Sequence, residues 1–296
     1  MKKVFLILGA MACLSISYSQ NFDDVIIQTT RVSDHIYMLE GSGGNIAVSI
    51  GEDGPLMVDS QYAPLSKKIR NAIDELSEKP VHILVNTHWH GDHVGGNENF
   101  GNTGAMIFAH DNVRKRMSKS QLMRAFSREI PASPEIARPV VTFSDEMSIK
   151  CNGEYLMLIH VDSAHTDGDA LIYFPESDVL HMGDTYFNGR YPFIDLSSGG
   201  SIDGVISATE KALFVAGENT KIIPGHGALS NRNELKQYQD VLKNFRQSVK
   251  ELIDQGKSLE EIKLLRPGKN SDAEYGTGFI SPERFVEIVF ESLTAN

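Results

Sequence analysis

Four side chains of the kinds that bind metal ions lie within six consecutive residues, namely His88, His90, Asp92 and His93. They follow an apolar, strand-like run over residues 81–86. Side chains two apart on an extended segment point the same way, so His88 and His90 can converge on one ion. Asp92 and His93 are adjacent and point in different directions, which suits a second ion. Imidazoles and a carboxylate this dense would be costly to bury without a metal, so the pattern predicts a metal site.

Three more candidate ligands stand in the second half of the chain, each in a loop beside an expected strand. His165 lies in Ser-Ala-His-Thr-Asp-Gly-Asp, Asp184 in Gly-Asp-Thr, and His226 in Pro-Gly-His-Gly. Each of these alone is typical of an ordinary loop or turn. Their joint occurrence after a complete His-x-His-x-Asp-His is the specific signal, and it predicts that the two halves share one site.

The elements that must position these residues occur in two similar series. The first series is an antiparallel meander and a βα unit, with strands expected over 25–30, 35–40, 45–50 and 56–59, a helix over 64–78, and strands over 81–86 and 105–109. The second has strands over 147–150, 155–161, 170–174, 179–182 and 221–223, with helices over 202–216 and 234–254. Two such halves are expected to pack sheet against sheet with helices outside. Ligand sites in sheets of this kind lie beyond the C-terminal ends of strands.

Residues 111–129 have a helical pattern and carry a group of basic side chains. Two interpretations stay open, a basic face that binds an anion and a solvated helix face beside the site. Further along, Ser258 with Glu261 three residues later predicts a helix that begins with a capping box, and Ser281 followed by Pro282 predicts the start of the last helix.

The N-terminal 19 residues have the composition of an export signal. Lys2 and Lys3 precede an apolar run over 4–14 that is too short to span a bilayer, and Ser17-Tyr18-Ser19 is typical of a cleavage site. We therefore expect a periplasmic or secreted protein. Residues 20–296 are expected to form a single domain with C-terminal helices from about residue 231.

Charge and composition limit the partners. The chain has 39 acidic and 28 basic residues and a formal net charge of −11. Such a surface disfavours nucleic acid, and the absence of a second long apolar segment predicts no stable membrane insertion. A small molecule is the expected substrate, and nothing in the sequence indicates the oligomeric state. After export one cysteine would remain, Cys151, so no internal disulfide is expected.

The order of these motifs resembles that of the metallo-β-lactamase superfamily, over about residues 44–227. The resemblance implies an α/β fold, the αβ/βα four-layer sandwich with two face-to-face mixed β-sheets and helices outside. It also implies two Zn²⁺ ions, with iron or manganese also suited to these ligands. The roles that it implies are a first zinc on His88, His90 and His165, a second on Asp92, His93 and His226, a bridging Asp184, and an Asp59 that supports the ligands.

The activity implied by the resemblance is hydrolysis by a metal-bridging hydroxide that Asp92 orients. A β-lactam or another cyclic amide is one substrate class, in keeping with export. Two departures point elsewhere, because Asp184 replaces the zinc-binding cysteine of the commonest β-lactamase subclass and Phe187 replaces its substrate-binding lysine. Alternatives are a lactonase or thioesterase-type ester hydrolase, an iron-dependent oxidoreductase, and a metal-binding module without catalysis. Candidate substrate contacts on the following loop are Tyr186, Asn188 and Arg190, which an ordinary polar loop would explain equally well.

Overall fold

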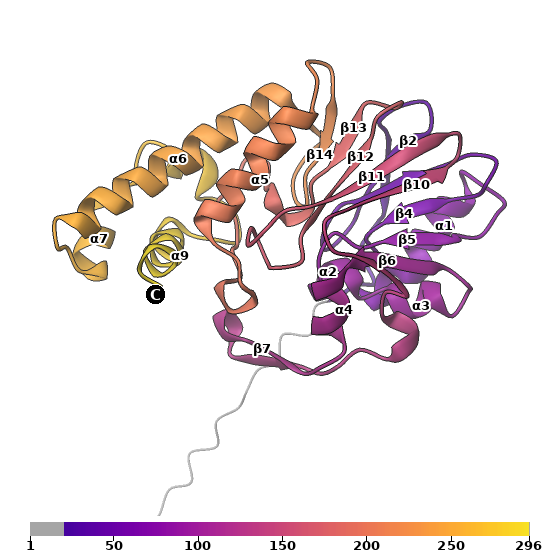
Figure 1. The fold of residues 1–296 in the computed structure, drawn as a ribbon, viewed down its shortest axis with the longest axis horizontal. Coiled ribbons are helices and arrows are strands. Elements are labelled where there is room, and N and C mark those ends of the chain that lie inside the picture. The colour runs from indigo at the N-terminus through magenta and orange to yellow at the C-terminus, as the bar shows by residue number, and fades with distance from the viewer. Residues whose placement is uncertain (1–20, 296) are drawn as a thin grey trace, which may run out of the picture.

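Two β-sheets lie face to face between two layers of helices in the computed structural model, which describes residues 21–295 (Figure 1). The expected export signal at residues 1–19 lies outside the described residues. Helices α1 (Ser66–Asp74) and α3 (Asn97–Gly101) cover the first sheet, and α5 (Ile202–Val215), α6 (Arg232–Asp254) and α9 (Pro282–Thr294) cover the second. The expected αβ/βα four-layer sandwich is confirmed.

The first sheet has seven strands in the order β1-β2-β3-β4-β5-β6-β9. Its strands β1 to β4 form the expected antiparallel meander, and β4, β5, β6 and β9 run parallel. Their bounds are Gln28–Arg31, Ile36–Glu40, Ile46–Ser49, Leu56–Val58, Ile83–Val85, Met106–His110 and Val141–Phe143. Because β4 and β5 run parallel, their C-terminal ends lie side by side.

The second sheet repeats this plan with six strands in the order β10-β11-β12-β13-β14-β15. An antiparallel meander leads into the parallel pair β13 and β14. The bounds of the strands are Glu146–Cys151, Glu154–His160, Ala170–Phe174, Val179–His181, Lys221–Ile223 and Ser230–Asn231. Each sheet therefore presents the C-terminal ends of neighbouring parallel strands, β4 and β5 in the first and β13 and β14 in the second, and predicted site residues follow these ends.

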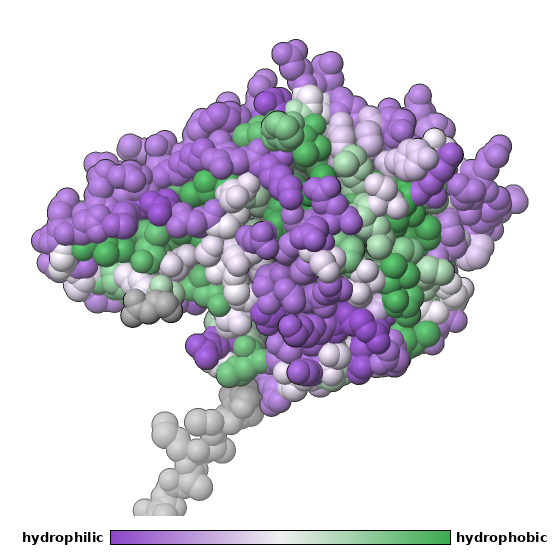
Figure 2. Space-filling view, in the orientation of Figure 1, coloured by the Kyte–Doolittle hydropathy of each residue, from purple (hydrophilic) through white to green (hydrophobic). Residues whose placement is uncertain are grey.

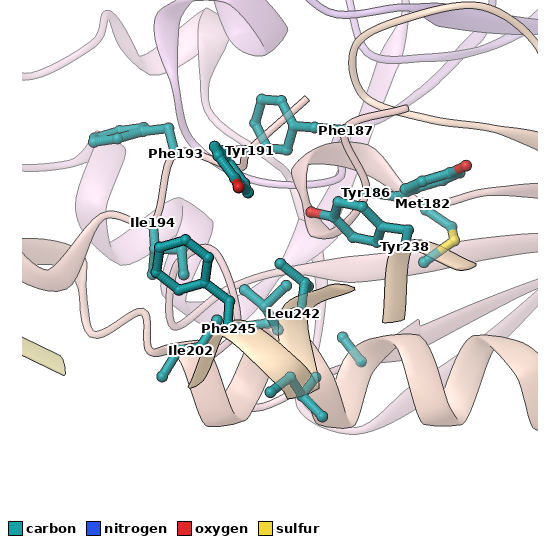
Figure 3. Packing of buried hydrophobic residues seen from close by; sticks show 14 of the residues in the cluster. Met182, Tyr186, Phe187, Tyr191, Phe193, Ile194, Ile202, Tyr238, Leu242 and Phe245 are labelled. Carbon is teal, nitrogen blue, oxygen red and sulfur yellow. The ribbon is translucent and has the colours of Figure 1, made fainter. Parts of the chain in front are cut away.

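Apolar residues fill all three spaces between the four layers. Val58 and Val85 of the first sheet pack with Leu158 and Ile172 of the second in one buried cluster. A second cluster lies between the second sheet and α5, α6 and α9, and Figure 3 shows its aromatic and aliphatic side chains at close range. The outward side of α6 is hydrophilic (Figure 2), whereas α7 (Leu259–Leu265) exposes Leu264 and Leu265. Helix α6 is thus amphipathic, as a helix of an outer layer must be.

Two helix starts follow the sequence patterns. Ser258 and Glu261 form a complete capping box at α7, and the Ser281 hydroxyl accepts a hydrogen bond from the Arg284 amide at α9. No helix within residues 21–295 combines the length and apolarity that crossing a bilayer requires.

The helix predicted over 111–129 is wrong beyond its first two turns. Helix α4 ends at Met117, and a hairpin of β7 (Gln121–Met123) and β8 (Arg128–Ile130) follows. Its connection has a left-handed residue, Ser127, with φ 48°. The hairpin is favoured over a helix because Met123 and Ile130 then pack against a buried cluster that contains Trp89.

Of the three basic residues of α4, Arg114 and Arg116 pair with acidic side chains, so these two do not present the free anion-binding face that was one of the two interpretations. Arg114 pairs with Glu135 at 2.6 Å, and Arg116 donates to both carboxylate oxygens of Asp167 at 2.6 and 2.7 Å. Their charges are thus already neutralised by the protein. Two further short helices are α2 (Gly91–Val94), which follows β5, and α8 (Asp272–Tyr275), which precedes α9.

We expect Phe245→Ala to destabilise the protein strongly. Phe245 is 3% exposed and packs against Tyr191 and Phe285 between α6 and α9. Loss of a buried ring of this kind lowers the free energy of unfolding by about 3–5 kcal/mol. The matched control is Phe214→Ala, because Phe214 is 91% exposed, and its effect should stay within about 0.5 kcal/mol. Urea unfolding followed by circular dichroism measures both, and equal losses would contradict this account of the outer layer.

Candidate metal centre

The predicted ligands meet where the parallel pairs of the two sheets end. His88 and His90 follow β5, and Asp92 and His93 lie on α2 directly after it. Asp184 lies in a 3₁₀ turn after β13, and His226 follows β14. The two halves are tied together here, since the Asn45 side chain donates to the carbonyls of Pro224 and Gly227 at 3.0 and 2.8 Å. Both sheets therefore contribute to one site.

A first cluster consists of His88, His90, His165 and Asp184, all of them buried. One ligand atom from each lies within 4.8 Å of the corresponding atoms of the others. The Nδ1 atom of His90 and the Nε2 atom of His165 are 2.8 Å apart. Three imidazoles and a carboxylate that converge in this way form a four-donor set of the type that zinc binds.

A second cluster consists of Asp92, His93 and His226, whose donor atoms also lie within 4.8 Å of one another. It is more open than the first, because the side chains of Asp92 and His226 are 23% and 20% exposed. The Nε2 atom of His226 is 3.4 Å from Oδ2 of Asp92. This cluster is thus partly accessible from solvent.

Asp184 stands between the two clusters and turns one oxygen to each. Its Oδ2 atom lies 3.9 Å from Nε2 of His88 and 3.5 Å from Nε2 of His165. Its Oδ1 atom lies 3.1 Å from Nε2 of His93 and 3.4 Å from Nε2 of His226. This is the arrangement of a carboxylate that bridges two ions.

The side chains of the centre are better suited to binding metal ions than to hydrogen bonding with one another. Three buried atoms in the centre make no hydrogen bond of normal geometry within residues 21–295, namely Nε2 of His88, Nε2 of His93 and Oδ1 of Asp184, although the last two lie 3.1 Å apart. Buried polar atoms are rarely left in this state, because each loses its interaction with water without replacement. All three face the centre, so cations held there would satisfy them together. Imidazole and carboxylate donors suit zinc and also iron or manganese.

The electrostatics of the two clusters differ. Burial is the main reason that the pKa of His88 lies well below its usual range and that the pKa of His165 falls to about 4. Burial also opposes protonation of His93 and His226, but the charge of Asp184 outweighs it there. The pKa of His93 is therefore raised well above its usual range, and that of His226 rises to about 9.

Asp59 supports two ligands from beneath, as the sequence resemblance implied. Its carboxylate accepts hydrogen bonds from the Thr87 amide at 2.8 Å and the Thr87 hydroxyl at 2.7 Å, and its Oδ2 lies 2.8 Å from Nδ1 of His93. The Thr87 hydroxyl is in turn 3.1 Å from Nδ1 of His88. Contacts of this kind orient the ring so that the other nitrogen faces the metal.

Two further supports were missed by the sequence reasoning. Nε2 of His90 lies 3.0 Å from the carboxylate of Asp195, and Nδ1 of His165 lies 2.8 Å from the carbonyl of Phe193. The pKa of Asp195 is lowered, since burial is outweighed by its hydrogen bond and charge interaction with His90. Both supports come from the irregular segment after Asp184, where no motif marks them.

Two glycines allow the close approach that the centre needs. A Cβ atom at Gly44 would lie 2.1 Å from Cε1 of His93, and one at Gly225 would lie 2.1 Å from Oδ1 of Asp184. Any side chain at either position would displace a ligand.

The centre forms the floor of a cavity of about 680 Å³. His90, Asp92, Asp184 and His226 reach it from the metal side. Its walls are largely apolar and aromatic, and they include residues from the β7–β8 hairpin and from the segment before α9, namely Tyr62, Trp89, Met123, Phe126, Ile130, Phe187, Phe193, Phe279 and Ile280. The sequence reasoning missed this wall because it assigned the hairpin to a helix.

The three candidate substrate contacts lie in different places. Arg190 lines the cavity. Tyr186 does not, because it is fully buried beside Tyr238 and its hydroxyl bonds to Ser230 at 2.7 Å (Figure 3). Asn188 also lies outside the cavity lining, and its amide donates to the carbonyl of Ala228. The structure therefore gives no support to Tyr186 or Asn188 as substrate contacts, since the hydrogen bonds of both side chains stay within the protein.

Known proteins resemble this chain at moderate to low identity. The 2,4-dinitroanisole O-demethylase subunit alpha of Nocardioides sp. (strain JS1661) is 30% identical over 142 residues, which are 47% of this chain but 40% of that protein. The metallo-beta-lactamase type 2 of Bacteroides fragilis is 18% identical over 267 residues, covering 84% of this chain and 99% of that protein. The chain thus spans less than half of the first relative.

Solved structures share the fold. The stereoselective inverting sec-alkylsulfatase Pisa1 from Pseudomonas sp. matches with a TM-score of 0.68 at 17% identity, over 90% of this chain and 50% of that one. The sequence profile of the metallo-beta-lactamase superfamily matches residues 39–237, a span that contains every predicted ligand. By its fold, its ligand order and this match, the chain belongs to the metallo-beta-lactamase superfamily.

Proposed function

We propose that this chain is an exported dinuclear zinc hydrolase that opens a cyclic amide, as a β-lactamase does, or cleaves a related ester. The observation that carries the proposal is Asp184, whose two carboxylate oxygens face two separate groups of ligands at the floor of one cavity. Export is the part of the proposal that rests on the composition of residues 1–19.

Two zinc ions bound at such a site would lower the pKa of an attacking water toward about 7 and would polarise a substrate carbonyl. The protein supplies the positioning. His88, His90 and His165 form a closed and buried group, whereas Asp92 and His226 are partly exposed to the cavity. The reacting bond is therefore expected beside the second cluster.

Asp92 is suited to orient the attacking water rather than to keep its proton. Burial raises the pKa of Asp92, but the charge of His93 outweighs it, and the pKa is about 2. The carboxylate is thus ionised at neutral pH and a weak base. Its Oδ2 faces His93 and His226 at 3.7 and 3.4 Å, which leaves Oδ1 to accept a hydrogen bond from the water.

An ester substrate is favoured by one feature of the cavity. Phe187 occupies the position three residues after Asp184, and its ring stacks on His226 with centroids 5.2 Å apart. The wall beside the second cluster is therefore apolar where the commonest β-lactamase subclass presents a lysine. Within the proposed hydrolase, this supports the lactonase or ester-hydrolase alternative as second candidate.

We expect His88→Ala to remove bound metal and hydrolysis together. The substitution deletes a donor whose ring is buried and held by Thr87, so no neighbouring side chain can replace it. Metal content is measured by inductively coupled plasma mass spectrometry, and the turnover rate is measured with the best substrate. We expect the turnover rate to fall by at least about 100-fold. The same measurement identifies zinc, iron or manganese in the unaltered protein.

The matched control is His35→Ala, because His35 is exposed and lies outside both clusters. It should keep full metal content and rate. Unchanged turnover by His88→Ala after loss of one metal equivalent would contradict the dinuclear proposal.

A substrate panel separates the two candidate activities. The mature protein is assayed with nitrocefin beside a set of lactones, aryl esters and thioesters. Nitrocefin hydrolysis above background supports the cyclic-amide activity, and strong lactone or ester cleavage with nitrocefin at background supports the alternative. A fully metallated protein that hydrolyses no compound of either class would refute the hydrolase proposal.

A further inference from the structure

Two arginines of the cavity lack any partner in the protein. Arg128, on β8, and Arg190, on the loop after Asp184, both line the cavity, and both are exposed. Within residues 21–295, neither guanidinium makes an ion pair or donates to a carbonyl or carboxylate. Both guanidinium groups, which are charged at all physiological pH values, are thus free to contact a molecule that enters the cavity.

The other arginines show that this state is unusual here. Apart from exposed Arg124, each of the remaining arginines in residues 21–295 donates to a carboxylate or to a backbone carbonyl, namely Arg31, Arg70, Arg114, Arg116, Arg138, Arg232, Arg246, Arg266 and Arg284. The chain has 39 acidic residues, so acceptors are plentiful. Arg128 and Arg190 line the same cavity and pair with no acidic side chain among residues 21–295, whereas Arg124 does not line the cavity.

Both arginines are held by contacts of their own segments. The hairpin that carries Arg128 reaches across the cavity, where the ring of Phe126 lies 5.4 Å from that of Phe193 and 5.8 Å from that of Phe279. The stem of Arg190 packs on Gly278, at which an added Cβ would lie 3.1–3.2 Å from three of its carbons. Two segments outside the metal centre thus bring two cations to one cavity.

The charge of Arg128 also affects the pKa of Tyr62, which lines the same cavity. Burial and the charge of Asp92 raise the pKa of Tyr62 to about 12, while the charge of Arg128 opposes this rise. Arg128 and Asp92 therefore act on the same phenol. Arg128 and the predicted metal ligand Asp92 thus line the same cavity.

We propose that Arg128 and Arg190 form a subsite for a carboxylate of the substrate, and that the substrate is an apolar or aromatic monoanion. Its apolar body would lie against the aromatic wall, and its carboxylate would accept charge-assisted hydrogen bonds from the two guanidinium groups. The planar guanidinium matches a carboxylate in geometry as well as in charge. This inference rests on the proposed function and names the class of molecule on which it acts.

Trp89 provides a direct test of binding, because it is the single tryptophan of the chain and lines the cavity. The metallated protein is titrated with 4-phenylbutyrate and with its neutral isostere 4-phenylbutanamide, and the indole fluorescence is recorded. We expect the acid to bind at least tenfold more tightly than the amide. Arg128→Gln and Arg190→Gln should each weaken binding of the acid about tenfold and leave the amide unchanged, since hydrogen bonds to charged groups have about this effect.

Two control variants keep the test specific. Arg124→Gln removes a charge from the same hairpin outside the cavity, and it should not change either affinity. Arg128→Lys keeps the charge but loses the planar donor pair, so it should bind the acid better than Arg128→Gln. A preference for the acid that survives both glutamine substitutions, or failure of the acid to bind, would overturn the subsite.

A second measurement separates failure of the subsite from failure of the proposed function. The p-nitrophenyl monoester of glutaric acid and p-nitrophenyl pentanoate offer the same scissile bond with and without a carboxylate. Selective loss of hydrolysis of the anionic ester in the glutamine variants supports the subsite. If neither ester is cleaved by a protein whose fluorescence shows the preference for the acid, the hydrolase proposal fails and the subsite stands. If both are cleaved at rates that neither substitution changes, the subsite fails and the hydrolase stands.

Discussion

The buried carboxylate of Asp59 is the interaction on which the metal centre depends. Its backbone is held in the left-handed region, with φ 63°, directly after β4. A residue other than glycine adopts this conformation only when its surroundings stabilise it, and here the Asp59 amide donates to the carbonyl of Val85 at 2.8 Å. The turn aims the carboxylate at Thr87 and His93, and Thr87 in turn positions His88. One side chain thus aligns one ligand of each cluster.

The two clusters differ in the pKa values of their histidines. Burial lowers the pKa of His88 and His165 in the first cluster, while the pKa values of His93 and His226 are raised. A neutral imidazole offers its lone pair at once, whereas a protonated one must first lose its proton. On these pKa directions we expect metal binding at neutral pH to displace protons from His93 and His226. The second cluster is also the more open one, since Asp92 and His226 are partly exposed.

The sequence was sufficient for the centre and insufficient for the cavity above it. Each ligand lies within a few residues of the end of a strand, and strand ends are marked by local patterns, so the site and its sheets follow from periodicity and motif. Tyr186 and Phe187 show the limit. They are neighbours on extended backbone and point to opposite sides, one into the core and the other into the cavity, and no local signal tells which is which. Asp195 meets His90 across 105 residues of sequence.

The β7–β8 hairpin adds a wall to the cavity without contributing a predicted ligand. Its residues have a helical pattern, but contacts with Trp89 and with the aromatic rings across the cavity outweigh that preference. None of its residues is a predicted ligand, so changes in it would alter the shape and charge of the cavity without removing a donor. The segment before α9 stands in the same relation to the centre, since Phe279 and Ile280 line the cavity from the far end of the chain. The sandwich therefore supplies a reactive centre that members of one superfamily can share, and the segments added around it decide which molecule reaches it.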